Sequence, residues 1–531
     1  MQGNFHWIDG AIIVVYLMIL SAIGFYFSKR QKNLDDFFLA RHSMAWFPVG
    51  LSLMAALNSG IDYLMQPSSV GKYGVVLLLG TSSWLMLYPW VAKVTLPFYR
   101  RLNSYTAYEY LERRFDVRVR TLAATIFLLW RLGWMGTAMY VPCLAVSAAT
   151  GGRLPLIPMI VGLGCIVTLY TMLGGIKAVI WTDVTQFCIM FGGLAATVAI
   201  VLMNVPGGLG EIWSTAQAAG KTSLAIPIPG ASEAGFLTRI GLFLKQDITI
   251  IGILISTMVG RMAVYTSDQV MVQRLQTTRT VRGARQAFVI NAVGDALWMF
   301  GLGFVGLALF TYTRTHGLPA GFKPDEGLPY FMSRVFPAGV IGLVIAAIFA
   351  ASLSSIDSAI NSCTSVVVID LYNRLFMKRQ AKDQDASPDG QRAQIRVSRI
   401  ATVIFGVIGI VLASNVGRIG DLIEIANKVI QLFTGPLLGI YFLGMFTQKA
   451  RGGGVLIGGA MGAAMSVYIA FWSPLGFLWP TVMGFLTTYM LGYALSISQG
   501  PAPKSGISLT FRSVMSRPEE LPREELSEVS R

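Results

Sequence analysis

A row of hydroxyl side chains lies within the long apolar stretch 336–371. Ala351, Ser354, Ser355, Ser358 and Ser362 follow one another at i, i+3, i+4, i+7 and i+11, the spacing of a single helix face. Hydroxyl groups in a membrane helix can hold neighbouring helices together. They can also offer neutral oxygen ligands to a hard monovalent cation, and this segment alone favours neither function over the other.

A polar interruption, Asn58-Ser59-Gly60, lies in the middle of the apolar run 45–66. Because Asn, Ser and Gly are poor helix formers, we expect the helix to unwind there. Unwound backbone at membrane depth is tolerated where it lines a cavity, and its free carbonyl groups can bind cations. Met258–Arg261 in the seventh apolar run is a second expected break. Two interrupted helices five spans apart indicate inverted repeats with a binding site near the membrane midplane.

Six ionisable side chains lie well inside apolar runs, where they are costly and therefore candidates for function. They are Asp62, Arg131, Asp183, Arg261, Asp295 and Asp357. The planar guanidinium group of Arg131 or Arg261 is suited to bind the carboxylate of a solute. Each could instead pair with Asp62 or Asp295 and only fix helix packing. These four residues are the candidate substrate ligands, and a zwitterionic solute would use both signs of charge.

The elements that position these residues are apolar helices. Of 531 residues, 54% are hydrophobic and 13% are charged, about half the charged share of a soluble domain. Because a hydrocarbon core about 30 Å thick requires about 20 apolar residues per helix, we expect an all-α membrane protein with about 13 transmembrane helices. The expected spans are 8–28, 45–66, 73–98, 121–149, 154–173, 178–204, 247–272, 284–313, 336–371, 397–415, 421–446, 453–472 and 477–497.

The basic residues predict the orientation. Lys and Arg cluster after the first, third, seventh and ninth spans, with Arg114, Arg120 and Arg274 among them. By the positive-inside rule, the N-terminus lies outside and the C-terminus in the cytoplasm of a protein of the plasma (cell inner) membrane. The net charge of +15 resides mainly in these loops, so nucleic acid is not an expected partner. We expect a solvated loop over 205–246 and a disordered cytoplasmic tail over 498–531.

Three other functions fit parts of this pattern. A channel also has polar residues at membrane depth, but no pore-loop selectivity sequence is visible. An enzyme would need a nucleophile with a base, or a metal, whereas the carboxylates lie singly on different helices. We therefore expect no enzymatic activity and no organic cofactor. Proton coupling through Asp183 or Asp357 is an alternative to sodium coupling.

Four motifs resemble those of the sodium/solute symporter family, and the similarity covers residues 8–497. They are Asp36–Trp46, Thr106–Phe115, Gly174–Asp183 and Ser354–Tyr372. The resemblance implies a LeuT-like core of two five-helix inverted repeats, about 45–204 and 247–446, with one extra N-terminal and two extra C-terminal helices. It also implies a single transporter domain over residues 1–497 that carries a small organic solute with sodium across the lipid bilayer by alternating access.

The same resemblance implies ligands for the co-transported sodium ion. At the principal site, carbonyl oxygens would come from Ala55, Asn58 and Ala351, and hydroxyl groups from Ser354 and Ser355.

A possible second sodium site would contain Asp183, Asp357 and Ser358, together with Ser354. Asp357 departs from the hydroxyl residue common in the family. This departure puts the second site in doubt, because a carboxylate there could strengthen it, take up a proton or replace it.

The expected substrate follows from a comparison of branches. The sugar-transporting branch usually carries Glu and Gln on its broken first core helix, where this chain has Ile61 and Asp62. That branch has Asn and Tyr on the sixth core helix and Lys on the seventh, where this chain has Arg261 and Val264, and Asp295. A simple hexose is therefore disfavoured. The run Gly435–Phe446 is more similar to the sialate, monocarboxylate and vitamin branches. We expect a carboxylate-bearing solute such as a monocarboxylate or sialic acid, with a sugar or an amino acid as the alternative.

Overall fold

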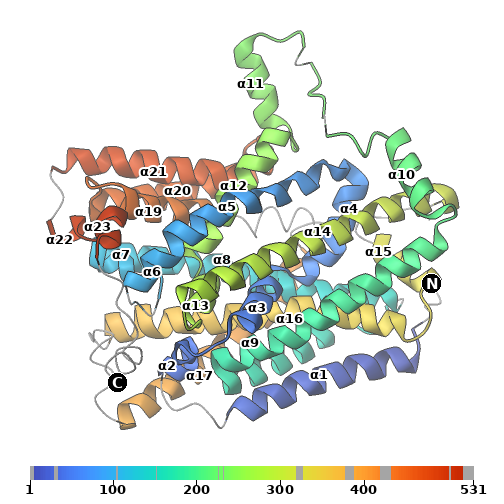
Figure 1. The fold of residues 1–531 in the computed structure, drawn as a ribbon, viewed down its shortest axis with the longest axis horizontal. Coiled ribbons are helices and arrows are strands. Elements are labelled where there is room, and N and C mark those ends of the chain that lie inside the picture. Colours follow the sequence, from blue (N-terminus) through green and yellow to red (C-terminus); the bar gives the residue numbers. More distant parts are fainter. Residues whose placement is uncertain are drawn as a thin grey trace.

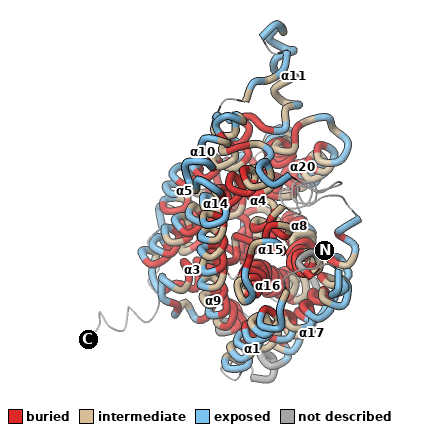
Figure 2. The backbone as a smooth tube through the Cα atoms, turned by 90° about the vertical axis from the view of Figure 1, so that its right-hand side faces the viewer, coloured by how far each residue is buried: buried red, intermediate tan, exposed pale blue. Residues whose placement is uncertain are grey.

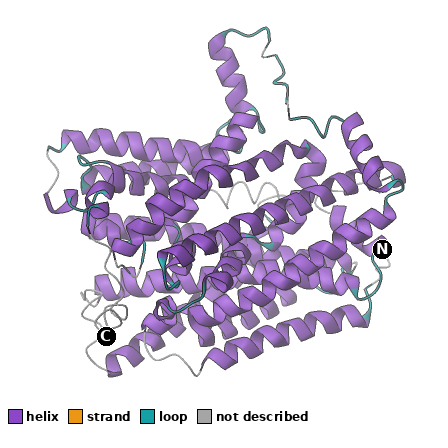
Figure 3. Ribbon diagram, viewed as in Figure 1, coloured by secondary structure: helices purple, strands orange, loops and turns teal. Residues whose placement is uncertain are grey.

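The protein is a bundle of long helices that run side by side (Figure 1). The computed structural model describes residues 5–28, 34–102, 104, 106–150, 152–224, 226–230, 232–317, 327–376, 388–418, 432–500 and 504–517. Within these ranges the regular structure is helical (Figure 3), with one isolated β-bridge between Met44 and Thr278.

The first half of the chain contains a broken helix, a composite helix and several long helices. Their bounds are α1 Trp7–Ser28, α2 Leu34–Leu39, η1 Ala40–His42, α3 Trp46–Leu57, α4 Gly60–Tyr73, η2 Val75–Ser82, α5 Ser83–Trp90, η3 Val91–Thr95, α6 Leu96–Leu102, α7 Glu109–Arg114, α8 Val117–Ala149, α9 Leu156–Asn204, α10 Gly208–Ala218 and α11 Phe236–Lys245. Helix α9 contains two spans joined at Gly175. The φ of 55° at this glycine produces a kink in the helix.

The second half begins with another broken helix and ends with a packed helical pair. Its elements are α12 Ile250–Ser267, α13 Gln269–Gln276, α14 Val281–His316, α15 Gly327–Val335, α16 Val340–Val366, η5 Val367–Phe376, α17 Pro388–Val416, α19 Thr434–Phe446, α20 Gly452–Trp472, α21 Trp479–Ser498, α22 Lys504–Ile507 and α23 Phe511–Met515.

Ten of the described helical segments are long and apolar enough to cross a membrane. Each overlaps one expected span. The expected span 45–66 is the broken pair α3 and α4, and 477–497 corresponds to α21. The expected span 421–446 ends in α19, and its first residues lie outside the described ranges. The chain is thus an all-helical membrane protein, while the count of thirteen spans stays a prediction.

Helix α16 forms the centre of the bundle, and every residue from Val344 to Val366 is buried. It packs against α9, α8, α1, α17 and α3, and Figure 2 shows it in the buried interior. A helix enclosed on all sides turns its whole hydroxyl row toward protein rather than lipid. The polar groups of α16 therefore meet protein partners.

The structure differs from the sequence-based expectation in two peripheral segments. The expected loop 205–246 contains α10 and α11, and α11 projects from the bundle in Figure 1. In α10, Ile212 and Ala216 are buried at the i, i+4 spacing of one helix face, which the Gly and Pro content of the segment obscures. In the expected disordered tail, Phe511 of α23 packs against Phe98 and Phe446.

Candidate functional site

The expected break in the second span is present between α3 and α4. Asn58 and Ser59 have extended backbone angles, with φ and ψ of −98° and 144° and of −129° and 168°. Asp62 stabilises the restart of the helix, because its carboxylate accepts the Ser59 backbone N–H over 2.7 Å. In return, the Ser59 hydroxyl accepts the Ile61 N–H over 3.2 Å, which completes the N-terminal cap. The last carbonyl groups of α3 have no partner within their own helix.

Helix α16 meets these carbonyl groups with its two central hydroxyl groups. Ser354 Oγ lies 2.8 Å from the Ala55 carbonyl oxygen and 2.8 Å from that of Ala351. Ser355 Oγ lies 3.0 Å from the Asn58 carbonyl oxygen. The structure thus brings together all five residues that the resemblance assigns to the principal sodium site, and each is at most 1% exposed.

Gly60 allows the close approach of α4 to α16. A Cβ atom at this position would lie 2.3 Å from Ser352 Oγ and 2.8 Å from the Ile348 carbonyl oxygen. Any larger residue would therefore separate the two helices at the first turn beyond the break. The resulting group of five oxygens is electrically neutral and buried, which suits a hard cation of low charge better than a divalent one.

A second polar cluster surrounds Asp183, where the sequence-based expectation was incomplete. Asp183 Oδ2 accepts a hydrogen bond from Ser52 Oγ over 2.5 Å and lies 3.0 Å from Arg274 Nη2. The Arg274 guanidinium also donates to the hydroxyl groups of Ser52 and Ser358. Its side chain is 0% exposed, so the expectation of a loop cation at 274 is wrong. Helix α13 turns inward and carries this arginine into the bundle.

Asp357 lies at the edge of the same cluster. Its carboxylate accepts hydrogen bonds from Tyr170 Oη over 3.1 Å and from Ser358 Oγ over 3.2 Å. Asp183 and Asp357 are close enough to interact electrostatically. The three residues of the possible second sodium site therefore share one buried cluster with a guanidinium group among them.

Two of the four candidate substrate residues, Arg261 and Asp295, form an ion pair, and a third, Asp62, lies in the first turn of α4 after the break. Arg261 Nη2 is 2.9 Å from Asp295 Oδ2, which also accepts Trp84 Nε1–H over 2.6 Å. The guanidinium group lies 4.2 Å from the centre of the Trp84 ring and donates to Ser83 Oγ over 2.9 Å. Asp62 is close enough to Asp295 for their charges to interact. The Arg261 side chain keeps 15% of its surface exposed, so this ion pair is open on one side.

Arg131 does not join the ion pair of Arg261 and Asp295. It forms an ion pair with Asp268, and its guanidinium group lies 4.4 Å from the Trp130 ring and 5.3 Å from the Trp134 ring. The alternative of pairing with Asp295 therefore holds for Arg261, whereas Arg131 has a partner that the sequence analysis did not single out.

Asp268 also marks the second helix break. Helix α12 runs unbroken through Met258–Arg261, so the expected break there is wrong. The helix ends at Ser267, and Asp268 caps α13 by accepting the Val270 N–H over 2.9 Å. An aspartate directly after an apolar run is a helix N-cap signal, and it would have located this break correctly.

A buried ion-pair network links two of the sequence motifs. Asp370, beyond α16, accepts hydrogen bonds from Thr106 Oγ1 and Arg120 Nε, each over 2.7 Å. Arg120 and Arg374 also bind Glu112, over 2.7 and 2.6 Å. The expectation of Arg120 as a loop cation is thus wrong, because its side chain is only 6% exposed. This network ties the segment 106–120 to the end of the central helix.

Known proteins share this architecture. The chain is 30% identical over 496 residues to the sodium/sialic acid symporter SiaT of Proteus mirabilis, covering 92% of this chain and 95% of that protein. It is 29% identical over 477 residues to the human sodium-coupled monocarboxylate transporter 1, covering 88% of this chain and 74% of that protein.

Solved structures agree on the fold. A Na⁺-coupled sialic acid symporter in a substrate-bound outward-open state matches with a TM-score of 0.82 at 29% identity, covering 94% of this chain and 100% of that chain. The nucleobase-cation-symport transporter Mhp1 shares the fold alone, with a TM-score of 0.56 at 14% identity over 89% of this chain and 97% of that chain. The fold is LeuT-like. Residues 37–462 match the Sodium:solute symporter family, and the chain therefore belongs to this family of sodium-coupled solute transporters, which are not enzymes.

Proposed function

We propose that this protein couples sodium entry to the uptake of a small carboxylate-bearing solute by alternating access. The observation that carries the proposal is the approach of the Ser354 and Ser355 hydroxyl groups to the Ala55 and Asn58 carbonyl oxygens across the helix break. Five neutral, buried oxygens from two apposed helices are a suitable coordination shell for sodium.

We propose Ala55, Asn58, Ala351, Ser354 and Ser355 as the ligands of the principal sodium ion. A hydroxyl group has two lone pairs as well as its hydrogen. The hydroxyl groups of Ser354 and Ser355 can therefore rotate so that their hydrogens point away from the site. The same oxygens, which now donate hydrogen bonds, can then coordinate the ion through a lone pair. Sodium would replace hydrogen bonds by stronger ion–dipole contacts and hold α3 against α16.

A second sodium ion would bind at Asp183, Asp357 and Ser358. Two carboxylates against the single guanidinium of Arg274 leave one negative charge in this cluster when all three groups are ionised. A sodium ion or a proton would neutralise it, so both occupants are compatible with the cluster.

Coupling follows from linkage between the two ligands. Sodium at the break favours one arrangement of α3 relative to α16, and a solute that binds the same arrangement gains affinity when sodium is present. A membrane potential of about 100 mV contributes about 2.3 kcal/mol for each charge that crosses it. The inward rocking of the loaded protein would release both ligands.

Arg261 is the proposed anchor of the solute carboxylate. Its guanidinium group is planar and its side chain is partly exposed, whereas Arg131 is enclosed with Asp268. A carboxylate can bind such a group through two parallel hydrogen bonds. The relatives named for sialic acid and monocarboxylates also transport carboxylate-bearing solutes, which supports this substrate class.

A zwitterionic solute such as an amino acid is a second candidate. Asp62 and Asp295 interact electrostatically beside a single Arg261, so the cluster has more carboxylates than cations. A solute with an ammonium group as well as a carboxylate would complement both signs.

The remaining parts of the proposal concern topology. We propose one transporter domain over residues 1–497, with repeats of about 45–204 and 247–446. In support, the two broken helices, α3 with α4 and α12 with α13, each stand first in one repeat. We also propose a plasma-membrane location with the N-terminus outside and the C-terminus in the cytoplasm, from the distribution of basic loops.

A thermal-shift screen of the purified protein tests the function. Monocarboxylates, sialic acid, amino acids and sugars are added in sodium chloride or in choline chloride at fixed pH. A true substrate stabilises the protein, and its apparent affinity is higher with sodium than with choline. Uptake into proteoliposomes then shows whether sodium or a proton gradient drives transport. Stabilisation that is equal in both salts, with uptake driven by pH alone, would exclude sodium coupling.

A further inference from the structure

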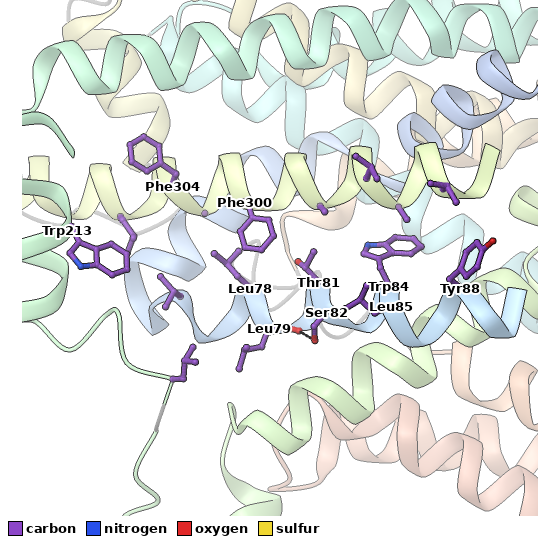
Figure 4. A pocket seen from close by; sticks show the side chains of 18 of the residues that line it. Leu78, Leu79, Thr81, Ser82, Trp84, Leu85, Tyr88, Trp213, Phe300 and Phe304 are labelled. Carbon is purple, nitrogen blue, oxygen red and sulfur yellow. Dashed lines mark hydrogen bonds between the residues drawn. The ribbon is translucent and has the colours of Figure 1, made fainter. Parts of the chain in front are cut away.

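A long apolar groove runs along the outside of α14. It has a volume of about 1160 Å³ and lies between α14, the composite helix of η2 and α5, and α10. Figure 4 shows Phe300 and Phe304 from α14, Leu78 from η2 and Trp213 from α10 around it. Leu85 and Phe300 are 81% and 53% exposed, so the groove opens to the surroundings of the bundle.

The length of the groove is close to the hydrocarbon thickness of a whole bilayer, which is far longer than a compact ligand. Its lining on α14 extends from Phe288 to Leu307, which is about 28 Å at 1.5 Å per residue. This distance approaches the hydrocarbon thickness of about 30 Å. An elongated, almost wholly apolar groove of this kind can accommodate an extended hydrocarbon chain.

Positive charge gathers at one end of the groove. The Lys221 ammonium and the Arg314 guanidinium lie 5.5 and 5.2 Å from the centre of the same Phe310 ring, one turn beyond Leu307. The Lys221 carbonyl oxygen accepts the backbone N–H of Val75, a lining residue, over 2.8 Å. Lys221 also donates to the carbonyl oxygen of Lys72. This cationic end is thus connected directly to the wall of the groove.

Within the described ranges, neither Lys221 nor Arg314 forms an ion pair with a carboxylate. Partial burial lowers the pKa of the Lys221 ammonium, and the neighbouring charge of Arg314 lowers it further. An anion between them would relieve this repulsion.

We propose that the groove is a binding site for an anionic phospholipid, with its acyl chain along α14 and its phosphate between Lys221 and Arg314. The apolar wall accounts for the chain, and the paired cations at the end of the wall account for the head group. None of the proposed sodium ligands lines this groove, whereas Trp84 lines it and also contacts Arg261 and Asp295 of the proposed solute site. The proposal does not depend on which solute is transported.

Native mass spectrometry of the purified protein tests the site. The protein in neutral detergent receives equal amounts of dioleoyl phosphatidylglycerol and dioleoyl phosphatidylcholine. We expect preferential retention of phosphatidylglycerol, and a loss of roughly fivefold for each cation removed in the variant Lys221→Gln/Arg314→Gln. The variant Ala292→Trp, which fills the groove, is expected to lose both lipids.

Matched controls separate the site from general charge and bulk. Lys245→Gln/Arg418→Gln removes two exposed cations elsewhere, and Ala464→Trp adds the same bulk to an exposed position of α20. Both should retain phosphatidylglycerol as the wild type does. Equal retention of the two lipids by the wild type, or unchanged preference in the Lys221→Gln/Arg314→Gln variant, would overturn the proposal. Because both cations lie at the periphery of the bundle, this variant remains informative if Ala292→Trp does not fold.

Discussion

Ser355 on α16 donates its hydroxyl hydrogen to the carbonyl oxygen of Asn58, a residue 297 positions earlier, over 3.0 Å. Asn58 is the point where α3 stops being helical. The contact thus joins the unwound backbone of the first core helix to α16, in which every residue from Val344 to Val366 is buried. Any ion that binds here would strengthen or weaken the association of these two helices, which is what ion-coupled transport requires.

The first prediction concerns this contact. Ser355→Ala removes one proposed sodium ligand and should raise the sodium concentration for half-maximal uptake roughly tenfold, because an interaction with a charged group contributes about 1.5 kcal/mol. Ser365→Ala removes another buried hydroxyl of α16, which donates to the Ser362 carbonyl oxygen and is not a proposed sodium ligand. It should leave sodium dependence unchanged. An identical sodium titration in Ser355→Ala and the wild type would refute the assignment.

The close packing of α4 against α16 makes Gly60 intolerant of a side chain. Gly60→Ala should lower the free energy of unfolding by about 1–3 kcal/mol, the usual cost of overpacking. Gly162→Ala in α9 is the control, since among the described residues no atom beyond the neighbouring residues and backbone of its own helix lies within 4 Å of an added Cβ. Thermal unfolding in detergent measures both. The prediction fails if the two alanine variants melt alike.

The buried pair of Arg274 and Asp183 should be costly to break from one side. Arg274→Gln leaves the carboxylate of Asp183 without its cation in a site that is 0% exposed, and we expect a loss of about 3–5 kcal/mol in stability. Adding Asp183→Asn should recover part of that loss, so the double variant is more stable than the sum of the single effects predicts.

The exposed pair of Arg118 and Asp116 provides the comparison. Its atoms are 3.9 Å apart, and the Arg118 side chain is 77% exposed. Arg118→Gln should therefore change stability by less than about 1 kcal/mol. If Arg274→Gln proved equally mild in the same unfolding assay, the buried pair would have no structural role.

Arg261 should determine recognition of the solute carboxylate. Arg261→Lys keeps the charge but loses the planar fork, and we expect KM for a carboxylate substrate to rise roughly tenfold from the loss of one charged hydrogen bond. Arg153→Lys, at an exposed position, should leave KM unchanged. An unaltered KM in Arg261→Lys would exclude Arg261 as the anchor.

Asp62 distinguishes the two substrate classes. Asp62→Asn should weaken the uptake of a zwitterionic solute, whose ammonium group loses its partner, while a solute with only a carboxylate keeps its affinity. Competition of both kinds of solute against one labelled substrate measures the difference. If both classes compete equally well in wild type and variant, Asp62 acts only as the cap of α4.

Local features of the chain were sufficient for much of this description. The length and apolar character of the helical runs specify a membrane protein, because each span must satisfy its own backbone hydrogen bonds in lipid. The break at Asn58 and Ser59 is also local, since poor helix formers and the Ser59–Asp62 cap lie within five residues. The hydroxyl row of α16 follows from helical spacing alone, and so does the facing of Ser354 and Ser355 to one side.

Partners distant in the chain required the folded arrangement. The spacing of residues in the sequence could not show that Arg274 would lie inside the bundle and pair with Asp183. It also could not show that Arg131 would pair with Asp268 rather than with Asp62 or Asp295. A buried charged side chain pairs with the opposite charge that helix packing places next to it, and that packing depends on the whole bundle. The amino-acid pattern thus specifies which groups need partners, while the three-dimensional assembly of helices selects the partners they have.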